Sequence, residues 1–179
     1  MKNKIQIANK AKNIKLIATD VDGVLTDGSI IILDSGEEVK VWDVYDRLAF
    51  TLIRNYGNGL KLAWITGRQS RQVATRAAEV GVHYLYQKCS DKLIALNEIM
   101  KKEGISSEEV AYIGDDLLDM PPILCCGFSA CPAGAVAEVK ETVDYVTERP
   151  GGRGAFRELV EIILKAKGLW DEVLKHYCS

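Results

Sequence analysis

Short apolar runs bounded by turn residues recur along the chain and predict buried β-strands. Almost every position within a run is apolar, which is typical of strands covered on both faces rather than of strands with one face in water. The runs lie at 16–19, 60–65, 110–113 and 127–131, with shorter ones at 84–86 and 145–147. This pattern predicts a sheet at the centre of the protein.

Between these runs, apolar residues recur at helical spacing. Helices are expected at 46–55, 71–80, 91–103 and 156–167, with a short one at 169–176. Gly81 and Gly104 directly follow two of them, where a glycine commonly ends a helix. The alternation predicts a three-layer, Rossmann-like α/β fold, in which a parallel sheet carries helices on both faces with right-handed crossovers. No repeat or low-complexity linker interrupts it, so we expect one domain over residues 1–179.

One segment departs from the alternation. Two β-prone stretches, 29–33 and 38–42, are joined by Asp34-Ser35-Gly36-Glu37 and predict a β-hairpin over 29–42 that could serve as a flap. The stretch from Asp27 to Thr66 is too short for a helical lid domain in addition to the intervening strand and helix. We therefore expect a capless protein whose cleft is open or is closed by another subunit. The tail, 149–179, begins with a glycine-rich link that we expect to be flexible.

Composition excludes several classes of partner. The net charge is −2 and no lysine or arginine block is present, so no nucleic-acid partner is expected. The chain has neither a secretory apolar core near its start nor an apolar run of roughly 20 residues, which predicts a cytoplasmic protein with no membrane partner. The five cysteines are odd in number and lack the C-x2-C spacing of zinc sites, so we expect free thiols.

Polar residues follow the predicted strands at the ends where ligands bind in parallel sheets. They are Asp20 and Asp22 after 16–19, Thr66 and Arg68 after 60–65, Lys92 at the start of a helix, and Asp115 and Asp116 after 110–113. Carboxylates crowded in this way repel one another unless a cation or a reacting phosphate lies between them. Oxygen ligands in a chain with two histidines favour Mg²⁺ over zinc or copper, and disfavour a Ser-His-Asp hydrolase.

The order of these groups resembles the haloacid dehalogenase superfamily. Its first motif, D-x-D-G-x-x-T, matches residues 20–26, and its later threonine, lysine and acidic pair match Thr66, Lys92 and Asp115-Asp116. The resemblance implies that Asp20 attacks phosphorus to form an aspartyl-phosphate, and that Asp22 acts as general acid and base. It also implies that Thr66 and Lys92 hold the phosphoryl oxygens.

The same resemblance implies a metal site. Mg²⁺ would be held by Asp20, the main chain at Asp22, and Asp115, and would offset the repulsion between a carboxylate and a phosphate. Asp116 and Asp119 would support the metal or its waters.

Within the superfamily, the chain is similar to the small capless phosphatases of phosphorylated eight- and nine-carbon sugar acids. The similarity rests on residues 20–28, the hairpin, and the stretches 65–68, 114–119 and 150–155. It implies phosphatase activity on an octulosonate 8-phosphate, a role in lipopolysaccharide biosynthesis, and a homotetramer in which a neighbouring subunit completes each site.

The similarity also implies the residues that contact the substrate. They are Asp22, Asp43, Val44, Tyr45, Asp46, Arg47, Arg68, Arg76 and Lys92. Because Arg68 and Arg76 are eight positions apart, we expect one helical face to present both to an anionic sugar. One stretch departs from the group, which usually carries Asp-Gly-x-Gly where this chain has Asp46-Arg47-Leu48-Ala49. Glycines there would let the backbone approach a ligand, so the identity of the sugar stays open.

Three alternatives stay open. The substrate could be a nonulosonate 9-phosphate or another phosphorylated metabolite. A signalling receiver domain also uses Asp, Thr and Lys around Mg²⁺, but there the acidic pair comes first, whereas here an acidic pair comes last. A non-catalytic oligomerisation module would have no need for the crowded carboxylates and the lysine.

Overall fold

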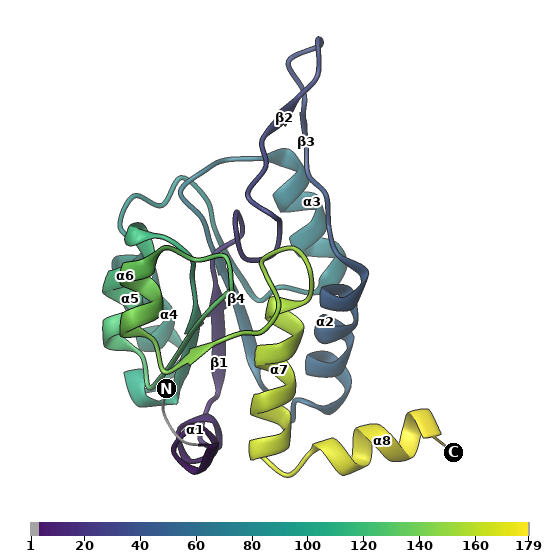
Figure 1. The fold of residues 1–179 in the computed structure, drawn as a ribbon, viewed down its shortest axis with the longest axis vertical. Helices are drawn as coiled ribbons and strands as arrows, with labels where there is room; N and C mark the ends of the chain where they lie inside the picture. The colour runs from purple at the N-terminus through teal and green to yellow at the C-terminus, as the bar shows by residue number, and fades with distance from the viewer. Residues whose placement is uncertain (1–3, 179) are drawn as a thin grey trace.

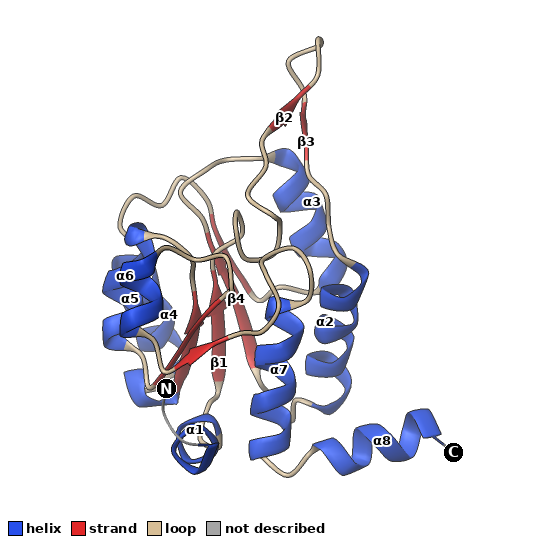
Figure 2. Ribbon diagram, in the orientation of Figure 1, coloured by secondary structure: helices blue, strands red, loops and turns tan. Residues whose placement is uncertain are grey.

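A six-stranded parallel sheet lies at the centre of the computed structural model, which describes residues 4–178 (Figures 1 and 2). The strand order is β5-β4-β1-β6-β7-β8. The strands are β1 Leu16–Thr19, β4 Lys61–Ile65, β5 Tyr84–Tyr86, β6 Val110–Ile113, β7 Phe128–Cys131 and β8 Tyr145–Val146. All six predicted strands are therefore confirmed. The most apolar ones, β1 and β6, are fully buried and lie side by side in the middle of the sheet.

Helices cover both faces of the sheet. They are α1 Lys4–Ala11, α2 Val44–Tyr56, α3 Arg71–Val80, α4 Lys92–Glu103, α5 Met120–Cys125, α6 Ala137–Thr142, α7 Ala155–Ala166 and α8 Trp170–Cys178, with 3-10 turns η1 Ser107–Glu109 and η2 Leu117–Asp119. Alternate residues of β1 belong to two separate cores. Ile17 packs with residues of α2 and α7, whereas Leu16 and Ala18 pack with Leu96 of α4 and Ile123 of α5. The predicted three-layer α/β fold is confirmed.

Local sequence signals explain where the helices begin and end. Asp43, Ser70 and Asp91 accept backbone hydrogen bonds at the starts of α2, α3 and α4. Gly81 and Gly104 end α3 and α4 in the left-handed conformation, with φ of 78° and 65°. The predicted helix ends are confirmed at both glycines, because glycine adopts this conformation without steric cost.

The hairpin projects from the end of the body at which β1 leaves the sheet (Figure 1). Its strands, β2 Ile31–Ile32 and β3 Glu38–Val39, are antiparallel, with Ile31 opposite Val39. They are shorter than predicted. β2 is exposed at both positions, and a two-stranded ribbon outside the main sheet gains little stability from extension. Its apolar side chains stay exposed, 65 % in the case of Ile32.

The N-terminal and C-terminal helices were predicted with unequal success. The polar sequence gave no signal for α1, which is held to the body by an ion pair of 2.7 Å between Lys10 and the buried Asp144. The predicted helix α8 exists and leaves the body at the end opposite to the hairpin (Figure 1). Within residues 4–178, no helix is both long enough and apolar enough to span a membrane.

Candidate active site

A cavity of about 250 Å³ opens at the carboxyl ends of β1, β4 and β6. Its lining contains eight of the predicted site residues, namely Asp20, Asp22, Thr66, Arg68, Lys92, Asp115, Asp116 and Asp119, together with Gly67 and Leu118. They come together because β1 pairs with β4 on one side and with β6 on the other, so that three loops distant in sequence meet at one edge.

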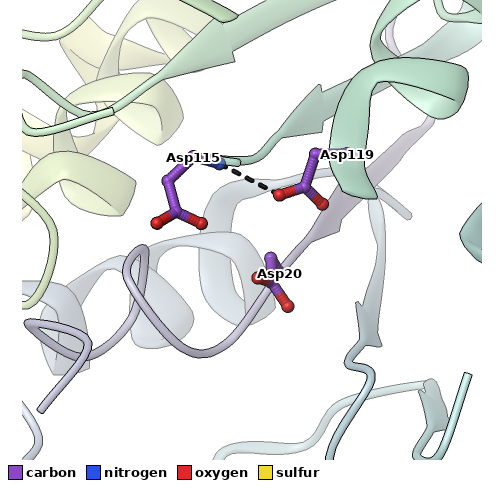
Figure 3. A group of neighbouring side chains, drawn as sticks. All are labelled: Asp20, Asp115 and Asp119. Atoms are coloured by element: carbon purple, nitrogen blue, oxygen red, sulfur yellow. Dashed lines mark hydrogen bonds between the residues drawn. The ribbon is translucent and has the colours of Figure 1, made fainter. Parts of the chain in front are cut away.

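Three carboxylates crowd together at this edge (Figure 3). Asp20, Asp115 and Asp119 each offer an oxygen, and these oxygens all lie within 4.8 Å of one another. Burial and the neighbouring Asp119 raise the pKa of Asp20 to about 7. The same two causes raise the pKa of Asp115 to about 6. The crowding therefore favours either protonation or a bound cation.

Lys92 supplies positive charge from the first turn of α4. Its Nζ lies 3.0 Å from Asp20 Oδ1 and 2.7 Å from Asp119 Oδ1, and its side chain is 3 % exposed. Burial lowers the pKa of Lys92, but the two carboxylates outweigh burial and raise it overall. One ammonium facing three carboxylates leaves two negative charges, which is the charge that one divalent cation neutralises.

Asp119 has no free hydrogen-bonding capacity. Its Oδ1 accepts hydrogen bonds from Lys92 Nζ and from Tyr112 Oη, each of 2.7 Å. Its Oδ2 accepts from the backbone N–H of Asp115 at 3.0 Å (Figure 3). The same oxygen accepts from the backbone N–H of Asp116 at 3.3 Å. The carboxylate thus fixes both the acidic loop and the lysine, which fits the supporting role predicted for it. Tyr112 was missed, because an apolar strand gives no sign that one of its residues donates to the site.

The remaining predicted supports lie at the same edge. Thr66 is buried at the end of β4, where its hydroxyl accepts from the N–H of Arg68 at 3.3 Å. The carboxylate of Asp116 accepts from the N–H of Leu117 at 2.7 Å and caps η2. Asp116 therefore shapes the acidic loop from outside, whereas Asp20 and Asp115 keep oxygens available for a ligand.

The loop after β1 is locked by the glycine-rich tail. A Cβ at Gly23, whose φ is 90°, would lie 2.0 Å from Asp115 Oδ2, so only glycine lets the two loops meet. Gly151 approaches equally closely, because a Cβ there would lie 1.7 Å from the carbonyl oxygen of Gly23. The N–H of Gly152 donates to the carbonyl of Val24 at 2.9 Å. The expectation of a flexible link is wrong, since Gly151 and Gly152 are buried against the site.

The base of the hairpin touches the site through charged side chains. Lys40 contacts the carboxylate of Asp22 and lies 2.8 Å from Glu38 Oε1. Arg68 binds Glu38 Oε2 at 2.5 Å, and its Nε lies 3.9 Å from Asp22 Oδ2. Glu38 and Lys40 were not predicted as site residues. Because they alternate with Val39 and Val41, both lie on one face of the predicted strand, but no local pattern indicated that this face contacts Asp22 and Arg68.

The segment predicted to bind substrate after the hairpin lies outside the cavity lining of its own chain. Asp43 caps α2, and the side chains of Val44, Tyr45 and Arg47 are exposed. Asp46 is buried and accepts from the N–H groups of Gly154 and Arg157 at 3.2 and 2.8 Å. Burial raises the pKa of Asp46 to about 6. Within one chain, the Asp46 carboxylate therefore joins α2 to the tail.

Arg76 also lies away from the cavity. It forms an ion pair of 2.8 Å with Glu79, and its guanidinium lies 5.9 Å from the ring centre of Trp42. The expectation that one helical face presents Arg68 and Arg76 together is wrong, because α3 begins at Arg71 and Arg68 belongs to the preceding turn. Arg68 lines the cavity, whereas Arg76 does not.

Comparisons with known proteins agree with this fold and site. A family model described as haloacid dehalogenase-like hydrolase matches residues 77–157. The chain is 42 % identical over 170 residues to the 3-deoxy-D-manno-octulosonate 8-phosphate phosphatase KdsC of Salmonella typhi, covering 93 % of this chain and 87 % of the relative. It is 39 % identical over 159 residues to the enzyme of the same name from Haemophilus influenzae, covering 89 % and 87 %.

Solved structures give the same result. The phosphatase of that name from Moraxella catarrhalis, in complex with magnesium ion, phosphate ion and a KDO molecule, matches with a TM-score of 0.93 and 41 % identity, covering 96 % of this chain and 98 % of that one. The Yersinia pestis enzyme matches with a TM-score of 0.88 and 39 % identity, covering 93 % and 89 %.

The fold and the crowded carboxylates thus define a haloacid dehalogenase-like hydrolase. Within that class, the chain belongs to the family of 3-deoxy-D-manno-octulosonate 8-phosphate phosphatases.

Proposed function

We propose that this protein is a Mg²⁺-dependent phosphatase that converts 3-deoxy-D-manno-octulosonate 8-phosphate to the free sugar acid and inorganic phosphate. The observation that carries the proposal is the position of Asp20, whose carboxylate lies 3.0 Å from Lys92 inside a cavity that Asp22, Thr66 and Asp115 also line. The names of the relatives and the contents of the Moraxella catarrhalis structure support it.

In the first step, an oxygen of Asp20 attacks phosphorus and forms an aspartyl-phosphate. The bond between phosphorus and the sugar oxygen breaks, and Asp22 protonates that leaving oxygen. In the second step, Asp22 takes a proton from water, which attacks the same phosphorus and frees Asp20. Lys92 offsets negative charge on the phosphoryl group throughout, and Thr66 holds one of its oxygens.

The donor set fits magnesium. The cavity lining offers carboxylates and no histidine or cysteine, which is the chemistry that hard divalent cations prefer. Asp20, the main-chain carbonyl of Asp22, and Asp115 would hold the ion, since hydrogen bonds occupy both oxygens of Asp119. When bound, Mg²⁺ lowers the repulsion between the Asp20 carboxylate and the phosphate dianion. Asp116 and Asp119 keep Asp115 in place.

We further propose that the whole chain forms one hydrolase domain and that four copies assemble through their hairpins. Two features support the assembly. The hairpin exposes Ile30, Ile31, Ile32 and Leu33, which are 43 to 65 % accessible and have no other function in a monomer. The segment 43–47 and Arg76 lie outside the cavity of their own chain, which supports a role for them in the site of a neighbouring copy. The free cysteines fit a cytoplasmic enzyme.

A substrate panel with and without magnesium tests the function. We expect the highest kcat/KM for 3-deoxy-D-manno-octulosonate 8-phosphate, a lower value for a nonulosonate 9-phosphate, and the lowest for 4-nitrophenyl phosphate. Excess EDTA should abolish all three activities, and added Mg²⁺ should restore them. If the octulosonate ester is hydrolysed no better than the nitrophenyl ester, the proposed substrate is wrong. If phosphate release survives EDTA, the proposed mechanism is wrong.

A further inference from the structure

Four charged side chains form a closed cluster between the hairpin and the cleft. They are Asp22, Glu38, Lys40 and Arg68, and each carboxylate meets both cations. Two negative and two positive groups leave the cluster neutral. The region around Asp20 differs, because three carboxylates there face the single ammonium of Lys92.

Three members of the cluster are largely shielded from solvent, whereas the Arg68 side chain is 44 % exposed. The side chain of Lys40 is 1 % exposed, that of Glu38 is 16 % exposed and that of Asp22 is 20 % exposed. The ion pairs of Lys40 are therefore stronger than pairs on an open surface, whereas solvent screens those of Arg68. In agreement, hydrogen bonds from Lys40 and Arg68 outweigh burial and lower the pKa of Glu38.

A sugar acid phosphate brings two anionic groups, a phosphate and a carboxylate. Lys92 and Thr66 are placed to receive the phosphate, as described above. Of the residues that line the cavity, Arg68 is the other cation, and its Nη2 is already bound to Glu38 at 2.5 Å. The Arg68 side chain is 44 % exposed, so a substrate carboxylate can approach its guanidinium, but it can take the Nη2 position only if Glu38 moves away.

The two carboxylates of the cluster differ in how firmly they are held. Asp22 belongs to the loop after β1, which packs against Gly151 and Gly152 of the tail. Glu38 belongs to β3, a strand of two residues that pairs with the exposed strand β2, and the contacts of its side chain are those with Lys40 and Arg68 in the cluster. Glu38 is thus the member that can move at the lower cost.

We propose that Glu38 is a specificity-determining residue that takes the place of the substrate's carboxylate in the empty enzyme. Its carboxylate keeps Lys40 and Arg68 paired and holds the base of the hairpin against the cleft. On binding, the carboxylate of the sugar acid takes the place of Glu38 at Arg68, and Glu38 turns away from the guanidinium. The inference deepens the proposed function and rests on it, because a substrate without a carboxylate would have no reason to displace Glu38.

The test compares Glu38→Gln with the matched control Glu37→Gln, whose carboxylate bonds Gln72 and lies outside the cluster. Glutamine keeps the size of the side chain and removes the competing charge. We expect the KM for 3-deoxy-D-manno-octulosonate 8-phosphate to fall about fivefold in Glu38→Gln, because a charge-assisted bond becomes a weaker neutral one. The ratio of kcat/KM for this ester to that for glucose 6-phosphate should rise by a similar factor. Glu37→Gln should leave both unchanged.

Two results would overturn the role of Glu38. One is a ratio that stays within twofold of the wild type. The other is an equal loss of kcat/KM on both esters, which a purely structural residue would cause.

A second readout separates this inference from the choice of substrate. The free sugar acid, 3-deoxy-D-manno-octulosonate, is tested as an inhibitor of 4-nitrophenyl phosphate hydrolysis. Glu38→Gln should be inhibited at about fivefold lower concentration than the wild type, since the carboxylate meets less competition. This holds even if another ester proves to be the preferred substrate. Equal inhibition of both proteins would refute the role of Glu38 while leaving the phosphatase activity standing.

Discussion

The catalytic edge of the sheet and the hairpin face the same cleft but are built in opposite ways. At the catalytic edge, four hydrogen bonds hold Asp119, and the loop after β1 leaves no room for a Cβ at Gly151. The hairpin has two strands of two residues each and exposes its apolar side chains. The difference indicates that contacts within one chain align the acidic groups at the sheet edge, whereas fewer contacts hold the hairpin in place.

The two regions also differ in charge. The catalytic edge carries an excess of carboxylates that a cation must neutralise, whereas the cluster at the base of the hairpin is neutral within itself. Metal dependence should therefore be confined to the catalytic edge. Substitutions at the catalytic edge and in the hairpin are therefore expected to have separate effects.

The largest effect is expected from Asp20→Asn. The amide has nearly the same shape but cannot attack phosphorus, so kcat should fall by about 10⁴-fold or more. Because the substitution also relieves repulsion with Asp119, the metal-free variant should unfold at a higher temperature than the metal-free wild type. Steady-state kinetics measures the fall in kcat, and thermal unfolding in EDTA measures the change in unfolding temperature. An unchanged kcat would mean that another group attacks phosphorus.

A smaller loss is expected from Gly151→Ala. The new methyl group would lie 1.7 Å from the carbonyl of Gly23, so the loop that carries Asp20 and Asp22 must shift. A displacement of about 1 Å at reacting groups lowers kcat by about 10²-fold, and overpacking costs about 1–3 kcal/mol of the free energy of unfolding. Gly134→Ala is the matched control, since a Cβ there meets no atom within 4 Å. Wild-type kinetics in Gly151→Ala would show that the tail does not hold the loop.

The hairpin is tested by Ile32→Lys, which places a charge among the exposed apolar side chains. If each copy buries this residue in an assembly, the dissociation constant should rise by about 10- to 100-fold. The free energy of unfolding of the separated chain should change by less than about 0.5 kcal/mol. Sedimentation velocity over a range of concentrations measures the assembly. Ser35→Lys, at the polar tip, is the control, and an equal shift in both variants would place the interface elsewhere.

The smallest effect concerns pH. The pKa values of Asp20 and Asp115 are raised from 3.8 to about 7 and about 6. At pH values between 3.8 and about 7, the folded protein holds protons on these carboxyl groups that the unfolded chain has released. The free energy of unfolding therefore falls as pH rises through this range. A cation at the site removes this penalty. Added Mg²⁺ should therefore raise the melting temperature by about 2–4 °C more at pH 8 than at pH 5.5. An equal increase at both values would place the ion away from these carboxyls.

Much of the catalytic edge follows from local sequence. Four successive apolar residues predict β1 at 16–19, and parallel pairing then brings the residues after β1, β4 and β6 to one edge. Prediction was poorer where local signals were weak. Helix α1 is mostly polar, and it joins the body through the pair between Lys10 and Asp144 and the burial of Ala11. The short helices α5 and α6 carry too few turns to show a period.

The parallel sheet, most of its flanking helices and the polar residues at its edge could be predicted from the chain alone, because each depends on residues that are neighbours in sequence. Three contacts became known only from the fold: Gly151 against Gly23, Tyr112 with Asp119, and Glu38 and Lys40 with Asp22 and Arg68. These contacts join side chains on different elements. Their existence depends on how the layers pack, which no local pattern of apolar and polar residues records.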